Sequence, residues 1–154
     1  MFQKILQGGG GGGSSEKKEG ILYWSDEESI IKNFDLYGSA TKDDWGNEIY
    51  IPNTSSLSMI QTKEPIEKGN FTKLHALIKN KIVVASNQVG VNLRICANKG
   101  SDDFIKSTNA SGKVGVWQEV ILDLTSVTAT SFYVTVTTFC RTDISGYVTR
   151  IWLD

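Results

Sequence analysis

Apolar and polar residues alternate in short runs along most of the chain after residue 20, and this alternation predicts β-strands. In the run 90–97, valine, leucine, isoleucine and alanine occupy the odd positions, while the even positions include Asn92, Arg94 and Cys96. A period of two places successive side chains on opposite faces, as in a strand with one buried face. The same pattern predicts strands over 21–24, 30–37, 48–52, 57–62, 73–85, 90–97, 117–125, 131–141 and 147–153.

The alternation also predicts which side chains are buried. In the last strand we expect a buried face of Ile151 and Leu153, opposite a second face of Val148, Arg150 and Trp152. In the run 117–125 the outward face is Glu119, Ile121 and Asp123. The other side chains expected in the core are Val91, Leu93, Ile95, Ala97, Val120, Leu122, Leu124, Phe132, Val134 and Val136.

One of these segments also fits a helix. Residues 25–28 (SDEE) match a capping box ahead of Ile30, Ile31 and Phe34, which would start a helix of one or two turns. The strand prediction is preferred for 30–37. Eight or nine short antiparallel strands in about 130 residues fit an all-β jelly-roll sandwich of two sheets, preceded by an extended N-terminal arm.

The arm is marked by an unbroken run of glycines. Glycine loses the most backbone entropy on ordering and has no side chain to bury, so this run cannot form part of a core. We therefore divide the chain into an arm (1–20) and a sandwich domain (21–154). The arm is either a disordered leader or, as we prefer, a flexible extension that docks on a neighbouring subunit. Its docking residues would be Phe2, Ile5 and Leu6, and its spacer Gly8, Gly9, Gly10, Gly11, Gly12 and Gly13.

Composition and charge exclude several classes of protein. The chain has 16 basic and 17 acidic residues and a net charge of −1, which is not the footprint of a nucleic-acid-binding protein. No apolar stretch approaches the roughly 20 residues needed to cross a bilayer. The first seven residues are too short for the apolar region of a signal peptide, so we expect synthesis in a cytoplasm. Alternation places Cys96 and Cys140 on opposite faces, which predicts two free thiols.

Catalytic chemistry leaves no trace in the sequence. The single histidine, His75, lies in a predicted strand, where packing or hydrogen bonding is the usual role of a lone histidine. No zinc-ligand spacing and no nucleophile, phosphate-binding or metalloprotease motif occurs. We expect a non-enzymatic protein without a cofactor. A structural calcium ion is the alternative for the loop carboxylates Asp43, Asp44, Asp102 and Asp103, since calcium prefers oxygen ligands.

Aromatic residues are the better candidates for function. Exposed aromatic rings stack on the apolar faces of sugars, while amide and charged groups bond to the hydroxyls. Trp45 lies in the predicted loop DDWGN, and Trp152 lies near Arg150 on the outward face of the last strand. We expect Trp117 to be partly in the core. The candidate glycan-binding residues are Trp45, Asn47, Arg150 and Trp152, with packing as the alternative for each tryptophan.

Three strands resemble those of the galactose-binding-like jelly rolls, the fold of many carbohydrate-binding modules. They are Lys73–Lys79 (KLHALIK), Val116–Thr125 (VWQEVILDLT) and Tyr147–Leu153 (YVTRIWL). The resemblance covers roughly residues 45–153. Its motifs are structural, so it implies a fold more than a function.

The arrangement of a glycine-rich arm before a jelly roll also resembles virion proteins of phages that infect Gram-positive bacteria. This resemblance implies a structural protein on the virion surface, made in the host cytoplasm, that assembles with other virion proteins and as a homo-oligomer. Capsid decoration is slightly preferred over tail-fibre or baseplate adhesion, and glycans are the expected outward partner, with no nucleic acid or membrane partner. The alternative is a stand-alone carbohydrate-binding module of a bacterial glycan-degrading system.

Overall fold

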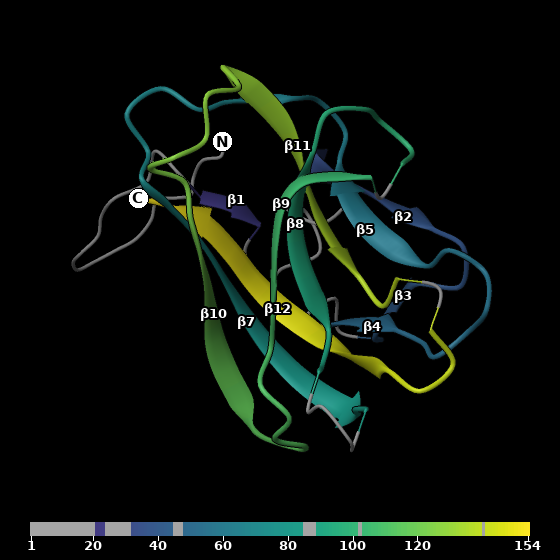
Figure 1. Cartoon of the computed structure of the whole chain (residues 1–154). Helices are drawn as coiled ribbons and strands as arrows, with labels where there is room; N and C mark the ends of the chain where they lie inside the picture. Colours follow the sequence, from purple (N-terminus) through teal and green to yellow (C-terminus); the bar gives the residue numbers. More distant parts are fainter. Residues whose placement is uncertain (1–20, 24–31, 45–47, 85–88, 102, 140) are drawn as a thin grey trace.

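The computed structural model describes residues 21–23, 32–44, 48–84, 89–101, 103–139 and 141–154. Almost all of the regular structure within them is β-strand (Figure 1). The strands are β1 (Ile21–Tyr23), β2 (Phe34–Tyr37), β3 (Thr41–Lys42), β4 (Ile49–Ile51), β5 (Met59–Thr62), β6 (Ile66–Glu67), β7 (Lys73–Ile82), β8 (Asn92–Cys96), β9 (Phe104–Asn109), β10 (Trp117–Asp123), β11 (Ser131–Thr137) and β12 (Ser145–Leu153).

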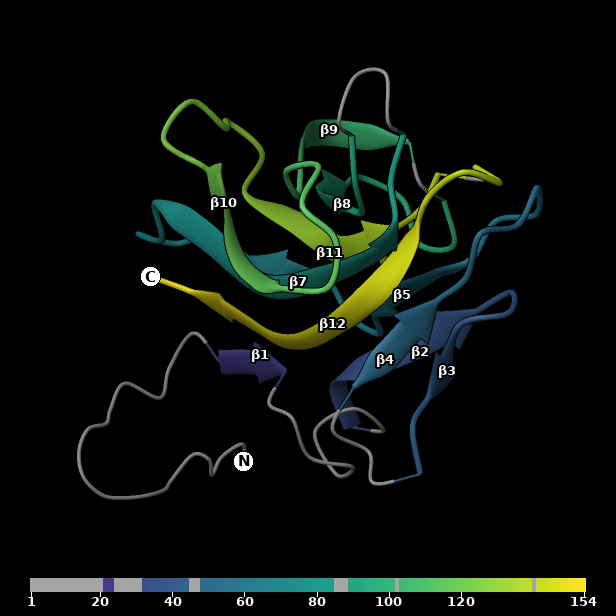
Figure 2. The same ribbon diagram turned by 90° about the horizontal axis from the view of Figure 1, so that it is seen from below.

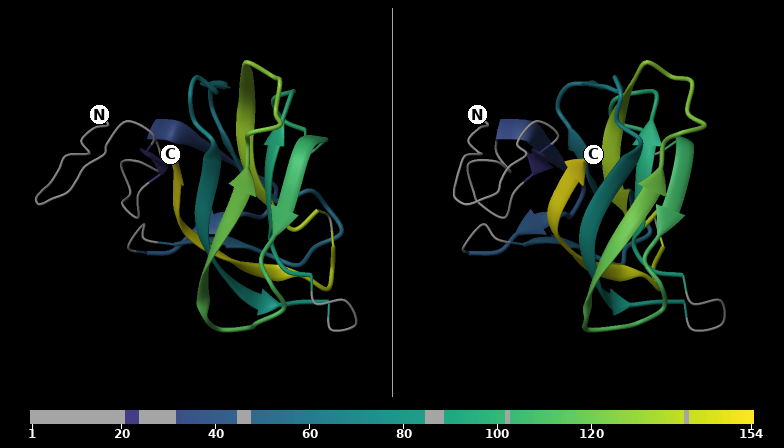
Figure 3. Two further views of the ribbon diagram at one scale, coloured as in Figure 1. Left: turned by 60° about the vertical axis from the view of Figure 1, so that its left-hand side comes forward. Right: turned by 90° about the vertical axis from the view of Figure 1, so that its left-hand side faces the viewer.

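The strands form two antiparallel sheets that pack face to face (Figures 1 and 2). In sheet 1 the order is β10-β7-β12-β4-β3, and β1 pairs with β12. In sheet 2 the order is β2-β5-β11-β8-β9, and β6 pairs with β11. Figure 3 shows β7, β10 and β12 running side by side along the molecule. The predicted jelly-roll β-sandwich is therefore confirmed.

The inner faces of the two sheets form one core. Alternate residues of β7 in sheet 1 pack toward alternate residues of β8 and β11 in sheet 2, and all of these side chains are buried. Burying a valine, leucine or isoleucine side chain contributes about 1.5–3 kcal/mol, so this layer is the main source of stability. Its fully buried members include Ile49, Ile51, Ile60, Leu74, Ala76, Ile78, Val91, Leu93, Ile95, Leu124, Val134, Val136, Val148 and Ile151.

Three strands were not predicted from the sequence, and several predicted strands are shorter in the structure than in the prediction. β3 and β6 have two residues each, too few for a periodic pattern. β9 is an edge strand whose residues are exposed or half-buried, so it has no buried face to produce an alternation. The segment predicted as 30–37 is a strand only from Phe34, with Lys32 and Asn33 in helical conformation; the proposed helix start at 25–28 lies outside the described residues.

Two predicted positions in sheet 1 are wrong. Val148 is fully buried, because a β-bulge between Val148 and Arg150 shifts the alternation by one residue. Trp117 is not in the core: it begins β10 on the outer face of sheet 1 and is 39 % exposed. Ala97 is also exposed, since it follows the end of β8.

Candidate functional site

A row of polar side chains crosses the outer face of sheet 2. Alternation assigns this face to solvent, yet Gln61 and Thr135 are fully buried and Arg94 is only 3 % exposed. Buried polar groups are costly unless they are hydrogen-bonded, so a buried row on the outer face of a sheet needs a reason. In register across the five strands β2, β5, β11, β8 and β9, the row is Asp35, Gln61, Thr135, Arg94 and Ser107.

The loop between β8 and β9 covers the middle of this row. The side-chain amide of Gln61 donates to the Thr135 hydroxyl at 2.9 Å and to the Ser101 carbonyl at 3.0 Å. Its carbonyl oxygen accepts the backbone N–H of Gly100 at 2.7 Å. The buried amide is therefore satisfied on both sides, and it fixes the loop on the sheet.

Lys99, the residue before Gly100, attaches the same loop at two further points. Its ammonium donates to the carboxylate of Asp35 at 2.9 Å and to the carbonyl of Lys63 at 2.6 Å. The hydrogen bond to Asp35 raises the pKa of Lys99 above its ordinary value. The loop is thus attached to β2 and to the end of β5 by a cation that stays charged at neutral pH.

Arg94 is enclosed by two phenylalanine rings. Its guanidinium carbon lies 4.5 Å from the ring centroid of Phe104 and 4.2 Å from that of Phe139. Both distances are within the range of cation–π attraction. The two rings remain 51 % and 47 % exposed, so each covers the arginine and still presents aromatic surface to solvent.

Phe139 adopts a backbone conformation that is unfavourable for a bulky residue. Its φ of 59° lies in the left-handed region, which costs about 1–3 kcal/mol for a non-glycine residue. The Thr137 hydroxyl accepts the N–H of Phe139 at 2.9 Å, and the Thr138 hydroxyl donates to the Pro52 carbonyl at 3.2 Å. These bonds hold the turn that places the ring against Arg94. Such strain is concentrated at functional sites, which makes this turn a candidate site.

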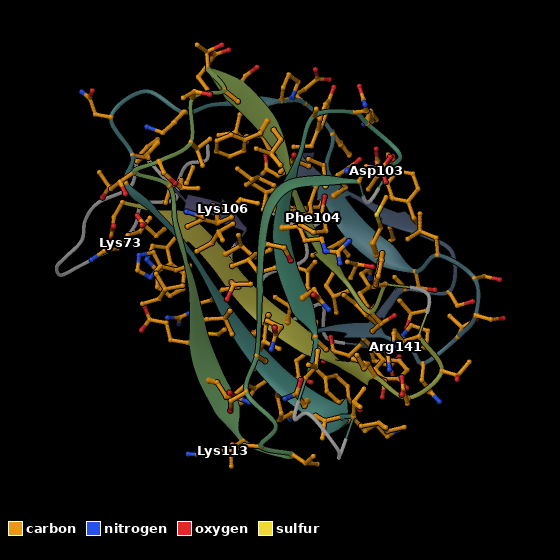
Figure 4. The ribbon with its side chains drawn as sticks, in the orientation of Figure 1. Lys73, Asp103, Phe104, Lys106, Lys113 and Arg141 are labelled. Carbon is orange, nitrogen blue, oxygen red and sulfur yellow. The ribbon has the colours of Figure 1, made fainter. Side chains whose placement is uncertain are left out.

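An exposed ion pair follows two residues after Phe139. Arg141 donates from Nε and from its terminal nitrogen to the two carboxylate oxygens of Asp143, at 2.9 and 2.8 Å. This hydrogen bonding lowers the pKa of Asp143 and raises that of Arg141. Figure 4 places Phe104 on β9 and Arg141 on the connection between β11 and β12. The pair leaves further donors and acceptors in the connection that carries Phe139.

Two of the four residues predicted as glycan-binding lie among the described residues, and they are not at this cluster. Arg150 and Trp152 lie together on the outer face of sheet 1, in register with Leu77 and His75 of β7. Trp45 and Asn47 lie outside the described residues, as do the arm residues Phe2, Ile5 and Leu6 and the glycine run. His75 is packed and hydrogen-bonded, as predicted: it is buried, and its Nδ1 lies 2.6 Å from a Glu119 carboxylate oxygen.

The calcium alternative gains no support from the described residues. Asp43 accepts the backbone N–H of Glu48 at 3.3 Å, which closes its own loop. In the described ranges, no group of three or more histidine, cysteine, aspartate or glutamate side chains could hold a metal ion. Asp102 and Cys140 lie outside these ranges. Cys96 is a buried free thiol, as predicted, with its sulfur 3.5 Å from the Thr135 hydroxyl.

Sequence reasoning missed Arg94, Phe104 and Phe139. One signal was present: Arg94 is the one charged residue of the run 90–97, at the middle of a predicted strand, and a charged side chain needs a partner wherever it is buried. No periodic pattern links it to Phe104 or Phe139, because the three residues come from β8, from β9 and from the turn after β11.

Comparison with known proteins shows the fold. No protein-family model and no curated protein sequence matches the chain. A mutant of a family 29 carbohydrate-binding module superposes with a TM-score of 0.56 at 11 % identity, over 86 % of this chain and 89 % of that one. A mutant of the family 29 module CBM29-2, complexed with cellulohexaose, gives a TM-score of 0.55 at 10 % identity over 86 % of this chain and 88 % of that one.

A module of a second family has a similar fold. The family 6 carbohydrate-binding module from Clostridium stercorarium, in complex with cellobiose, gives a TM-score of 0.51 at 13 % identity over 80 % of this chain and 88 % of that one. At such identities the likeness concerns the fold alone. Within the described residues, no helix has the length and apolar character that crossing a membrane requires.

Proposed function

We propose that this chain is a non-catalytic glycan-binding module and that its site is the Arg94 cluster, formed by Arg94, Phe104, Phe139, Arg141 and Asp143. The observation that carries the proposal is the guanidinium of Arg94 held between two half-exposed phenylalanine rings. The similarity in fold to carbohydrate-binding modules, including one complexed with cellulohexaose and one with cellobiose, supports it.

The cluster supplies the two kinds of contact that a sugar needs. The exposed surfaces of Phe104 and Phe139 offer apolar faces for the C–H groups of a pyranose ring. The Arg141–Asp143 pair offers donors and acceptors for hydroxyl groups. Because the rings are held by Arg94 and by the strained turn, little side-chain freedom remains to be lost on binding, and this preorganisation favours affinity.

Calorimetric titration with cellohexaose, followed by a glycan array, tests this proposal. We expect Phe104→Ala and Phe139→Ala each to weaken binding about tenfold, the loss that corresponds to about 1.4 kcal/mol of stacking. The matched control is Ile105→Ala, because Ile105 is the next residue of β9 and is similarly exposed. The absence of binding to every glycan tested, or full binding by both phenylalanine variants, would contradict the proposal.

The wider role of the module stays a prediction. The hypothesis of a phage virion protein, anchored by its arm for capsid decoration or tail adhesion, depends on residues 1–20, which lie outside the described residues. The similarity in fold is equally compatible with a stand-alone carbohydrate-binding module. Deletion of residues 1–13 separates the two: a virion protein should lose incorporation into particles and keep its fold by circular dichroism, whereas a stand-alone module should be unaffected.

A further inference from the structure

The outer face of sheet 1 carries a second row of side chains, and this row is aromatic and basic. Trp117 of β10 is in register with Lys79 of β7, Lys79 with Tyr147 of β12, and Tyr147 with Tyr50 of β4. Because neighbouring strands lie about 4.8 Å apart, the row crosses four strands over about 14 Å. Together with Lys81, two residues after Lys79, these residues form what we name the aromatic–lysine stripe.

The members of the stripe contact one another. The ammonium of Lys79 lies 4.7 Å from the ring centroid of Trp117 and 5.0 Å from that of Tyr147. The rings of Tyr147 and Tyr50 are 5.1 Å apart, and the ammonium of Lys81 lies 5.3 Å from Tyr50. Cation–π contacts thus place two ammonium groups among three aromatic rings.

Trp117 is held firmly at the exposed end of the stripe. The next residue, Gln118, accepts the N–H and hydroxyl of Ser111 at 3.0 and 2.6 Å and donates to the Lys113 carbonyl at 3.2 Å. The buried Asn80 donates to the same Lys113 carbonyl at 2.9 Å. The loop that leads into β10 is therefore fixed on β7. The backbone at Trp117 is held by this loop, while the indole ring remains accessible to solvent.

Among the residues that the structure describes, the positive charge of the stripe is only weakly compensated. A Glu48 carboxylate oxygen lies 4.0 Å from the Lys79 ammonium, the outer limit of an ion pair. Lys81 and Lys113 are exposed, and Figure 4 shows Lys113 at the end of β10 where Trp117 begins the strand. An anion that reaches this end of the sheet meets lysines from β7 and from the loop before β10.

We propose that the aromatic–lysine stripe is a second binding site, which takes a segment of an acidic polysaccharide that carries carboxylate groups. A sugar ring stacked on Trp117 or Tyr147 brings its carboxylate to Lys79, which already lies between these two rings. Lys81 lies on the same face, two residues or about 6.7 Å along the strand from Lys79. A second carboxylate of the same polysaccharide can therefore pair with Lys81. The site is on the sheet opposite the Arg94 cluster, so each can fail without the other.

Titration of the full chain with oligogalacturonate at low ionic strength tests the proposal. The ligand control is the methyl-esterified oligomer, which keeps the sugar backbone and loses the carboxylates. Lys79→Met keeps the aliphatic stem over the rings and removes the charge, and we expect about a tenfold loss of affinity. Lys73→Met is the matched control, because Lys73 lies on the same strand and the same face as Lys79. It is in register with Asp123 and lies at the far end of β7 from Lys113, away from the stripe (Figure 4).

The outcomes separate the two sites. The stripe is supported if Lys79→Met and Trp117→Ala lose binding of the acid oligomer. Lys73→Met and Phe104→Ala should keep it. If the unmodified chain does not bind the acid oligomer, the second site is overturned. Unchanged binding by Lys79→Met overturns it as well. The Lys79→Met result keeps the test decisive even if Trp117→Ala fails to fold. Loss in Phe104→Ala alone assigns the acid oligomer to the Arg94 cluster and overturns only the second site.

Discussion

His75 stacks on Trp152 with ring centroids 4.8 Å apart and ring planes 6° apart. The two residues are in register on β7 and β12, two adjacent inner strands of sheet 1. The imidazole is buried by this contact, and its Nδ1 meets Glu119 of β10. Three neighbouring strands are therefore joined on the outer face by one histidine, which gives Trp152 a structural role.

Replacement of Trp152 by alanine should lower the free energy of unfolding by about 1–3 kcal/mol. The indole is half-buried, so the loss of unfolding free energy should be smaller than for a fully buried tryptophan. Part of this loss comes from exposing the face of His75 on which the indole stacks. Urea denaturation measures the change. Ile121→Ala is the control, because Ile121 is in register with His75 on the other side and is largely exposed. An equal loss in both variants would contradict the structural role of the stack.

Asn80 should be among the least replaceable polar residues of the domain. It is fully buried, its amide donates to the carbonyls of Ser111 and Lys113, and its oxygen accepts the N–H of Val91 at 3.0 Å. Asn80→Ala removes all three hydrogen bonds and leaves the buried N–H of Val91 without its partner, and we expect a loss of about 2–4 kcal/mol. Asn80→Asp should be no milder, since a carboxylate faces two carbonyl oxygens.

The control for Asn80 is Asn53→Ala, which removes a single exposed hydrogen bond to the Thr142 carbonyl. Its expected cost is below about 1 kcal/mol. Denaturant titration of the three variants gives the comparison. A loss in Asn80→Ala no larger than that in Asn53→Ala would show that the loops around Asn80 are held by other contacts.

Phe139 offers a test of the strained turn, because glycine should be better tolerated there than alanine. Both substitutions remove the ring from Arg94, but only glycine adopts the left-handed conformation without steric cost. We expect Phe139→Gly to be about 1 kcal/mol more stable than Phe139→Ala in thermal or urea unfolding. Glycan affinity should fall equally in both. The opposite order of stability would mean that the turn changes conformation when the ring is removed.

The sequence predicted the core of this domain better than its surface. Alternation located Leu93, Ile95, Val134 and Val136 correctly, because burial of one face is what produces the pattern. The same reasoning assigned the opposite face of β8 and β11 to solvent, whereas the loop after β8 covers it. Alternation reports which face a side chain occupies, and a loop that folds over that face leaves the pattern unchanged.

The candidate site was harder to predict for a related reason. The rings around Arg94 are contributed by β9, an edge strand without periodicity, and by a turn whose left-handed residue is a phenylalanine rather than a glycine. The residues of the aromatic–lysine stripe are brought together only by the register of four strands. Trp117, Tyr147 and Tyr50 are far apart in the sequence, and cross-strand register is set by pairing, which the order of residues does not reveal.

The Arg141–Asp143 pair predicts a stability change at acid pH, and its sign follows from the pKa of Asp143. Hydrogen bonding to Arg141 lowers that pKa below the ordinary value of 3.8, so the folded state binds the proton less readily than the unfolded chain. The contribution of the pair is complete above the unfolded value and is lost as the pH falls through the folded value. The melting temperature of Asp143→Asn should therefore lie below that of the unmodified chain at neutral pH, and the difference should shrink toward zero in strong acid. Arg141→Met breaks the same pair and should give the same profile, whereas a difference that widens toward acid pH would contradict the assignment.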